Sequence, residues 1–275
     1  MSPVSRVHDV DGVRVHVVDT HPGSDARPVF LLHGNPDSHT LWDDVVRLLS
    51  DDAPPLRFIR PDMPGFGSSP EPPERFDYLS DSTTPLWTGL LHQLGIDQPL
   101  TVVLHDFGGP WFLPWVSRNP NQVRGLVVCD SPYHPTFQWH VWARIWRLPW
   151  VGELSTRFYS RALVRWEMRR GSKGLPLEYC DRIYEEMTPA MQRCVLRTYR
   201  SHGDAEAIFR AESARLNTVL QQIPARVVWG GKDPYLSIDQ AHTFGVPVEL
   251  VDDAGHWTPV EAPEVVAQAV RAVMA

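Results

Sequence analysis

Short apolar runs alternate with amphipathic segments along most of the chain. Residues 28–32 are continuously apolar, which predicts a strand buried on both faces. Residues 13–19 alternate between apolar and polar positions, which predicts a half-exposed strand. Further strands are predicted at 56–60, 100–104, 125–129, 225–230 and 246–251. Helices are predicted at 41–50, 84–95, 238–244 and 263–275. Strands that alternate with helices through short loops specify an α/β domain, a mostly parallel twisted sheet covered by helices on both faces.

One long segment departs from this alternation. Residues 132–216 contain no run typical of a buried strand, and they are helical in pattern, aromatic and rich in arginine. Five of the 11 tryptophans of the chain lie between Trp139 and Trp166. We therefore expect residues 1–131 and 217–275 to form one core, with 132–216 inserted as a helical lid, or cap. Such a cap would cover the carboxyl edge of the sheet, where ligands bind in open α/β folds. The alternative is a helical packing layer with no site beneath it.

Two motifs with chemical potential follow predicted strands. In "LLHGNPDS" a glycine-containing turn would let the backbone N–H of Asn35 point into a pocket as half of an oxyanion hole. The side-chain amide of Asn35 is a further donor. A plain β-turn would also explain this motif. In "TVVLHDFGGP" a strand stops at Asp106, in the pattern of the nucleophile elbow that usually carries serine.

The position of Asp106 decides what its carboxylate can do. A strained strand-to-helix turn presents the side chain to a ligand, and the adjoining helix N-terminus stabilises the ionised form. The alternative is an ordinary N-cap aspartate, which Gly108 and Gly109 and the other motifs make less favoured. Pro114 lies in the helix that follows and predicts that this helix is kinked or starts late.

A third motif, "DDAGHWTPVEAPE", follows the last predicted strand and contains His256. A histidine there, after a nucleophile and an acid along the chain, suits the general base of a catalytic triad. The acid that orients His256 has two candidates. Asp233 follows a buried strand in "VVWGGKDPYLS" and is favoured, whereas Asp130 follows the preceding strand in "LVVCDSPYHP".

With these motifs the chain resembles the α/β-hydrolase superfamily over nearly its full length outside the insertion. It is most similar to the Asp-nucleophile branch, the haloalkane dehalogenases and epoxide hydrolases. We expect Asp106 to attack a saturated carbon and form an alkyl ester, because a carboxylate displaces a leaving group there. His256, oriented by Asp233, would then activate water. The backbone N–H groups of Asn35 and Phe107 would hold the oxyanion.

The leaving group is open at this point. "HGNP" and "HDFGGP" look most like a haloalkane dehalogenase, and the resemblance implies that Asn35 helps to bind halide. Dehalogenases ordinarily carry tryptophan after the nucleophile, but this chain has Phe107, which has no N–H. A lid tryptophan could replace it, and the candidates are Trp139, Trp142, Trp146 and Trp150. The first alternative is an epoxide hydrolase that uses a lid tyrosine, from Tyr159, Tyr179, Tyr184 and Tyr199. A non-catalytic relative that binds a small apolar ligand is the second alternative.

The composition of the chain limits the classes of partner that it is expected to bind. The net charge of −7 and the lack of any run of lysine or arginine argue against nucleic acid and anionic membranes as partners. No apolar segment reaches the roughly 20 residues of a membrane helix, and no signal peptide is visible. The three cysteines are Cys129, Cys180 and Cys194, which suit a reducing cytoplasm. We expect a small apolar substrate under the cap, no metal or organic cofactor, and a monomer or homodimer.

Overall fold

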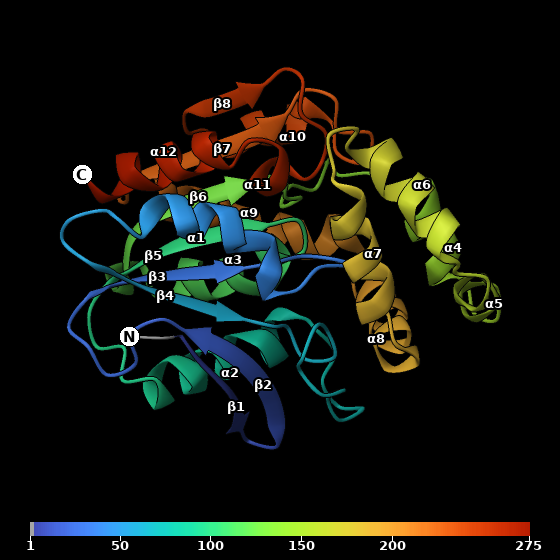
Figure 1. Ribbon diagram of the computed structural model, residues 1–275, viewed down its shortest axis with the longest axis horizontal. Coiled ribbons are helices and arrows are strands. Elements are labelled where there is room, and N and C mark those ends of the chain that lie inside the picture. The colour runs from blue at the N-terminus through green and yellow to red at the C-terminus, as the bar shows by residue number, and fades with distance from the viewer. Residues whose placement is uncertain (1–2) are drawn as a thin grey trace.

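Eight strands form one sheet in a computed structural model that describes residues 3–275 (Figure 1). The order across the sheet is β1-β2-β4-β3-β5-β6-β7-β8. β1 and β2 are antiparallel to their neighbours, and the other strands are parallel. The strands are β1 (Val4–Val10), β2 (Val13–Asp19), β3 (Arg27–Leu32), β4 (Leu56–Pro61), β5 (Leu100–His105), β6 (Val123–Cys129), β7 (Ala225–Gly230) and β8 (Val248–Val251). The predicted α/β architecture is therefore confirmed.

Helices cover both faces of the sheet and form two apolar cores. One face packs against α2 (Ser80–Gln93), α3 (Gly108–Arg118) and α9 (Ala205–Leu220), and the other packs against α1 (Asp43–Leu49) and α12 (Pro263–Met274). Shorter pieces are η1 (His39–Trp42), η2 (Pro120–Gln122), α10 (Ile238–His242) and α11 (Thr258–Glu261). Burial on both faces explains why β5 is apolar at nearly every position, since each side chain meets a helix.

The helical insertion lies between β6 and β7. It contains α4 (Val141–Arg147), α5 (Val151–Arg157), α6 (Arg161–Gly171), α7 (Leu177–Glu186) and α8 (Pro189–Ser201), followed by α9. Figure 1 shows α4 to α8 gathered at one end of the sheet, beyond its strands. The predicted boundary at 216 falls within α9, which packs against α3 of the core. The division into core and cap stays a prediction. The boundary predicted at its C-terminal side lies inside α9 rather than between two elements.

Three local expectations need correction. β1 was not expected, because its residues are mostly exposed and show no apolar face; it is an edge strand held by pairing with β2. β2 is almost wholly buried instead of half exposed. The helix after Asp106 does not start late, because α3 begins at Gly108 and runs through Pro114. A proline there lacks the N–H that would bond to the carbonyl of residue 110, four positions earlier.

The three cysteines are free and buried, so they form no disulfide with one another. None of the helices among residues 3–275 is both long enough and apolar enough to cross a bilayer.

Candidate active site

Five loops meet at the carboxyl edge of the sheet and bring the predicted site residues together. They follow β3, β5, β6, β7 and β8 and carry Asn35, Asp106, Asp130, Asp233 and His256. Because β3, β5, β6, β7 and β8 are neighbours and parallel, residues that are far apart in sequence reach one edge. The sheet topology thus assembles the site.

Asp106 occupies the turn between β5 and α3. Its φ of 47° lies in the left-handed region, which aspartate tolerates better than most residues but which is strained. The turn is fixed at the main chain, since the Asp106 carbonyl accepts bonds from the Ser131 hydroxyl (2.6 Å) and the Gly109 N–H (3.0 Å). A Cβ on Gly109 would lie 1.9 Å from Ser131 Oγ, so this contact requires glycine. The strain aims the carboxylate away from the sheet and toward the insertion.

The loop after β3 approaches this carboxylate closely. The backbone N–H of Asn35 donates to Asp106 Oδ1 at 2.7 Å. A Cβ on Gly34 would lie 2.4 Å from the same oxygen and 2.6 Å from the Phe107 nitrogen, which explains the need for glycine. The backbone N–H of Phe107 also favours the charged form of Asp106. One carboxylate oxygen therefore lies where two main-chain donors converge.

His256 lies between two carboxylates. Its Nδ1 contacts Asp233 Oδ2 at 2.7 Å, and its Nε2 lies 3.6 Å from Asp106 Oδ2, which is too far for a direct hydrogen bond. Asp233 Oδ1 accepts the N–H groups of Tyr235 (2.7 Å) and Leu236 (3.1 Å). Asp233 thus has one oxygen fixed by the main chain and the other aimed at the imidazole.

Asp130, the alternative acid, does not contact His256. Its Oδ1 accepts the Gly230 N–H at 2.7 Å, and its Oδ2 accepts the Thr258 hydroxyl. Burial, followed by the charge of Asp233, raises the pKa of Asp130 well above its ordinary value. The geometry thus favours Asp233 as the partner of His256 and leaves Asp130 as a buried group that ties β6 to the β7 and β8 loops.

The charges of the site stabilise one another. Burial acts to raise the pKa of Asp106, but His256 and the nearby donors outweigh it, and the pKa lies below the ordinary value. Burial acts to lower the pKa of His256, but the charge of Asp233 and then the contacts with Asp106 outweigh it, and the pKa lies well above the ordinary value. The resting site therefore contains an ionised Asp106 beside a protonated His256.

A largely apolar cavity lies between this constellation and the insertion. The insertion contributes most of its aromatic wall: Phe137, Trp139, His140, Trp142, Trp146, Tyr159 and Tyr199. The loops of the sheet contribute Asn35, Asp106, Phe107, Tyr235, Leu236, His256 and Trp257. The cavity can hold a small apolar molecule against the Asp106 carboxylate.

The predicted insertion residues separate into two groups. Trp139, Trp142, Trp146, Tyr159 and Tyr199 line the cavity. The other three do not line it: Trp150 is 86% exposed, the Tyr179 hydroxyl donates to the buried Asp37, and Tyr184 stacks under an arginine.

Tyr199 and Trp146 each offer a polar atom on this wall. Tyr199 is buried, and its hydroxyl oxygen accepts a bond from Asn35 Nδ2 at 3.3 Å. The Trp146 indole N–H is buried and has no hydrogen-bond partner among residues 3–275.

Among the cavity residues that the sequence analysis did not single out, His140 and Tyr235 lie closest to the chemistry. His140 lies in the run "QWHVW" and caps α4, where its Nδ1 accepts the Ala143 N–H at 3.3 Å. Burial lowers the pKa of His140 to about 4, so the ring is neutral and its proton is on Nε2. Tyr235 follows Asp233 by two residues and packs edge-on against His256. Only the closeness of Tyr235 to "KDP" could have indicated it, whereas nothing in the sequence distinguishes His140 from a packed helix residue.

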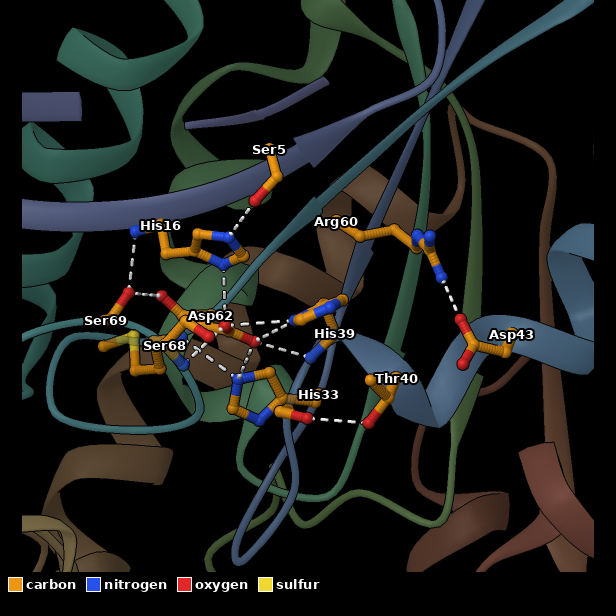
Figure 2. Close-up of polar contacts among 12 residues, drawn as sticks. Ser5, His16, His33, His39, Thr40, Asp43, Arg60, Asp62, Ser68 and Ser69 are labelled. Atoms are coloured by element: carbon orange, nitrogen blue, oxygen red, sulfur yellow. Dashed lines mark hydrogen bonds and ion pairs between the residues drawn. The ribbon is translucent and has the colours of Figure 1, made fainter. Parts of the chain in front are cut away.

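A second polar cluster lies behind the Asn35 loop, and Figure 2 shows it. The carboxylate of Asp62 accepts the ring Nδ1 atoms of His16 (2.8 Å) and His39 (2.9 Å), and the N–H groups of His39 (2.6 Å) and Ser68 (2.9 Å). These three side chains are the residues of 3–275 whose ligand atoms come close enough for a metal ion. Both carboxylate oxygens of Asp62 already accept hydrogen bonds from the protein, so this cluster is suited to joining the 33–39 and 62–69 loops. It also buries His16, which explains why β2 is less exposed than its pattern predicts.

Comparison with known proteins identifies the family. The alpha/beta hydrolase fold family matches residues 27–263. The chain belongs to the α/β-hydrolase fold family. It is 28% identical to a cis-3-alkyl-4-alkyloxetan-2-one decarboxylase of Xanthomonas campestris, over 96% of this chain and 93% of that protein. It is 28% identical to haloalkane dehalogenase 2 of Mycobacterium tuberculosis, over 97% and 93%.

Two further comparisons agree. The chain is 25% identical to epoxide hydrolase 1 of Caenorhabditis elegans, over 97% of this chain and 69% of that protein. The crystal structure of haloalkane dehalogenase DbeA from Bradyrhizobium elkani covers 99% of both chains with a TM-score of 0.79 at 22% identity. The predicted family resemblance is confirmed, and these relatives support a hydrolase of this family.

Proposed function

We propose that this protein hydrolyses bonds at saturated carbon through a covalent alkyl ester on Asp106. The observation that carries this proposal is the placement of the Asp106 carboxylate, with Oδ1 held by the Asn35 N–H and Oδ2 facing His256 across 3.6 Å. Oδ2 attacks the carbon, and the bond to the leaving group breaks with its electron pair. Oδ1 then becomes the ester carbonyl oxygen, beside donors that also suit the later oxyanion.

Alkylation itself would convert His256 into a base. The ionised Asp106 is one of the groups that raise the pKa of His256. When Asp106 becomes a neutral ester this contribution is lost, so the pKa of His256 falls and its Nε2 proton passes to water. The neutral ring, fixed through Nδ1 by Asp233, then takes a proton from water, which attacks the Asp106 carboxyl carbon. Collapse breaks the bond between this carbon and Oδ2, and the departing oxygen of the product takes the proton back from His256.

The cavity wall favours an epoxide as the substrate. The Tyr199 oxygen accepts from Asn35, which leaves its own O–H proton without an acceptor among residues 3–275. The His140 Nε2–H is a second donor on the same wall. An opening epoxide develops an alkoxide, a strong base that takes a proton from a phenol, whereas halide needs only hydrogen bonding. Tyr199 would protonate this oxygen and regain a proton from the water that is consumed.

A halide leaving group is the second candidate, and a specific observation supports it. The buried Trp146 N–H has no partner among the described residues, and it faces the same cavity as the Asn35 amide. These two donors could replace the indole that Phe107 lacks. Loss of one preorganised donor costs about 2.7–4 kcal/mol of barrier, so a dehalogenase would need such a replacement.

The proposal is tested with His256→Gln protein, which should form the ester but not hydrolyse it. We would incubate it separately with a terminal epoxide, a bromoalkane and a 3,4-dialkyl β-lactone, the ring named in the Xanthomonas relative. Intact-mass and peptide measurements should show a stable adduct on Asp106 with at least one of them. Asp106→Asn is the control and should show none. Absence of any adduct, while the wild type hydrolyses a simple ester, would overturn the proposal.

Two matched variants separate the leaving groups. Tyr199→Phe should slow adduct formation from the epoxide and leave the bromoalkane nearly unaffected if the phenol acts as an acid. Trp146→Phe should do the reverse if the indole binds halide. A loss of about 10²-fold or more in the affected reaction is expected for one removed donor. Equal losses with both substrates in both variants would indicate packing roles instead.

A further inference from the structure

Charge is distributed very unevenly between the two parts of the chain. Residues 132–216 contain 14 arginines and lysines against nine aspartates and glutamates, a net charge of +5. The remaining residues carry −12, which completes the total of −7. Such an asymmetry indicates a segment that meets a negatively charged partner. The expectation of no anionic membrane partner used the total charge and the lack of lysine or arginine runs, and neither reveals the net charge of the insertion.

An apolar face lies on the outer helix of this insertion. Trp150, Val151, Leu154 and Phe158 are 86%, 48%, 55% and 68% exposed. They occupy positions i, i+1, i+4 and i+8 on and beside α5, so they share one side of the helix. We call these four residues the α5 face. The opposite side of α5 is buried and packs against α4 and α8. No other segment among residues 3–275 covers the α5 face.

Basic side chains flank this face. Arg157 on α5 and Arg144 on α4, the helix that packs against α5, are exposed and form no ion pair among the described residues. Glu153, the acid of α5, is already paired with Arg200. Figure 1 shows α5 at the outer end of the insertion, away from the sheet. The surface that projects farthest from the core is therefore apolar, aromatic and basic.

We propose that the α5 face and its flanking arginines bind the surface of an anionic phospholipid membrane. Aromatic and aliphatic side chains on one side of a helix enter the interface between headgroups and acyl chains, and arginines remain at the headgroups. Each cation near an anionic surface adds attraction. A second copy of the chain fits less well, because a two-fold interface would place the arginines of one α5 face against those of the other.

Membrane binding would place the cavity beside a reservoir of apolar substrate. The cavity is lined by Trp142 and Trp146 of α4 and by Leu163 and Val164 of α6, the helices that precede and follow α5. This consequence rests on the proposed function, since it assumes that the cavity takes an apolar substrate. The binding itself does not depend on catalysis.

The test is cosedimentation of the full chain with vesicles, using the inactive Asp106→Asn protein so that turnover plays no part. We expect binding to vesicles of phosphatidylcholine and phosphatidylglycerol, little binding to phosphatidylcholine alone, and weaker binding at high salt. Trp150→Ser with Phe158→Ser should lower the affinity about tenfold or more, since both side chains would enter the lipid. Arg144→Glu with Arg157→Glu should lower it similarly.

A matched control uses exposed apolar residues of the sheet. Val7→Ser with Leu250→Ser removes apolar side chains that are 52% and 48% exposed on β1 and β8, outside the insertion, and should leave binding unchanged. The proposal is overturned if the protein does not bind anionic vesicles. It is also overturned if the Val7→Ser, Leu250→Ser change lowers the affinity as much as the Trp150→Ser, Phe158→Ser change. The proposal is also overturned if sedimentation shows dimers that the Trp150→Ser, Phe158→Ser protein no longer forms. The α5 face would then bind a second copy of the chain. If the His256→Gln protein forms the Asp106 adduct but the chain does not bind vesicles, the membrane proposal is refuted and the proposed function still stands.

Discussion

Replacement of Asp233 by asparagine should stop ester hydrolysis and leave ester formation intact. The structure dictates how the new amide must lie. Asp233 Oδ1 accepts two main-chain N–H groups, from Tyr235 and Leu236, so the amide oxygen of the asparagine must take that position. Its NH₂ group then faces His256 Nδ1 and donates to it. The ring proton is driven to Nε2, the nitrogen that must be unprotonated to activate water.

The expected magnitude follows from this wrong tautomer. In the Ser-His-Asp hydrolases the same change lowers kcat about 10⁴-fold, which corresponds to about 5.4 kcal/mol of barrier. Here the loss should fall on the second step alone, because Asp106 keeps its charge and its bond from the Asn35 N–H. Rapid-quench mass spectrometry should therefore show an ester that forms at the wild-type rate and then persists.

Asp130→Asn is the matched control, because Asp130 is an equally buried acid on the neighbouring loop. It bonds to Gly230 and Thr258 and not to His256, and its raised pKa favours the neutral form that asparagine mimics. Turnover by Asp130→Asn should thus remain close to that of wild type. If Asp233→Asn turns over within tenfold of wild type, or if Asp130→Asn is damaged as much, the assignment of the orienting acid is wrong.

Three further outcomes are expected. Gly34→Ala would place a Cβ 2.4 Å from Asp106 Oδ1 and should slow ester formation about 10²-fold, measured by rapid quench, with circular dichroism unchanged. As pH falls from about 8 to about 5, acid-quenched samples at steady state should contain more ester. Asp106, whose pKa is lowered, still attacks, whereas His256 in the ester has lost the Asp106 charge that raised its pKa and becomes increasingly protonated over this range. Constant ester would contradict the assigned base. The buried Arg57 guanidinium lies 2.7 Å from the Asp19 carboxylate, and Asp19→Ala would leave it without this partner. The free energy of unfolding should then fall by about 3–5 kcal/mol in urea titrations. The double change Asp19→Asn, Arg57→Leu should recover part of this loss.

The fold was largely predictable because its strands are buried on both faces. Runs such as 100–104 are apolar for a reason that the sequence displays directly, and β5 is observed at Leu100–His105. β1 could not be predicted this way, since an edge strand with exposed side chains has no apolar pattern and depends on pairing with β2. Burial of β2 was underestimated because the loop around Asp62, distant in sequence, covers His16.

The candidate site likewise contains residues that the sequence pattern could place and residues that it could not. Residues at strand ends, such as Asp106 and His256, could be placed from sequence because the order of parallel strands brings their loops to one edge. Asp233 is favoured over Asp130 by its turn motif, but both loops lead to the histidine, and the difference is made by main-chain donors that the sequence does not display. His140 belongs to a helix whose position is set by packing, so no spacing along the chain could predict that it lines the cavity.

The net charge of the whole chain does not describe the charge of the insertion. A charge of −7 describes the far field of the molecule, but contact with a surface depends on the charges within about a Debye length, roughly 8–10 Å. Over that distance α5 and the helix packed against it present exposed arginines and the α5 face. The acidic core would keep the molecule from lying flat on an anionic membrane, so repulsion and attraction together would select one orientation, with the cavity helices toward the lipid. The orientation of the proposed binding would thus be set by the whole charge distribution, although only the insertion would touch the membrane.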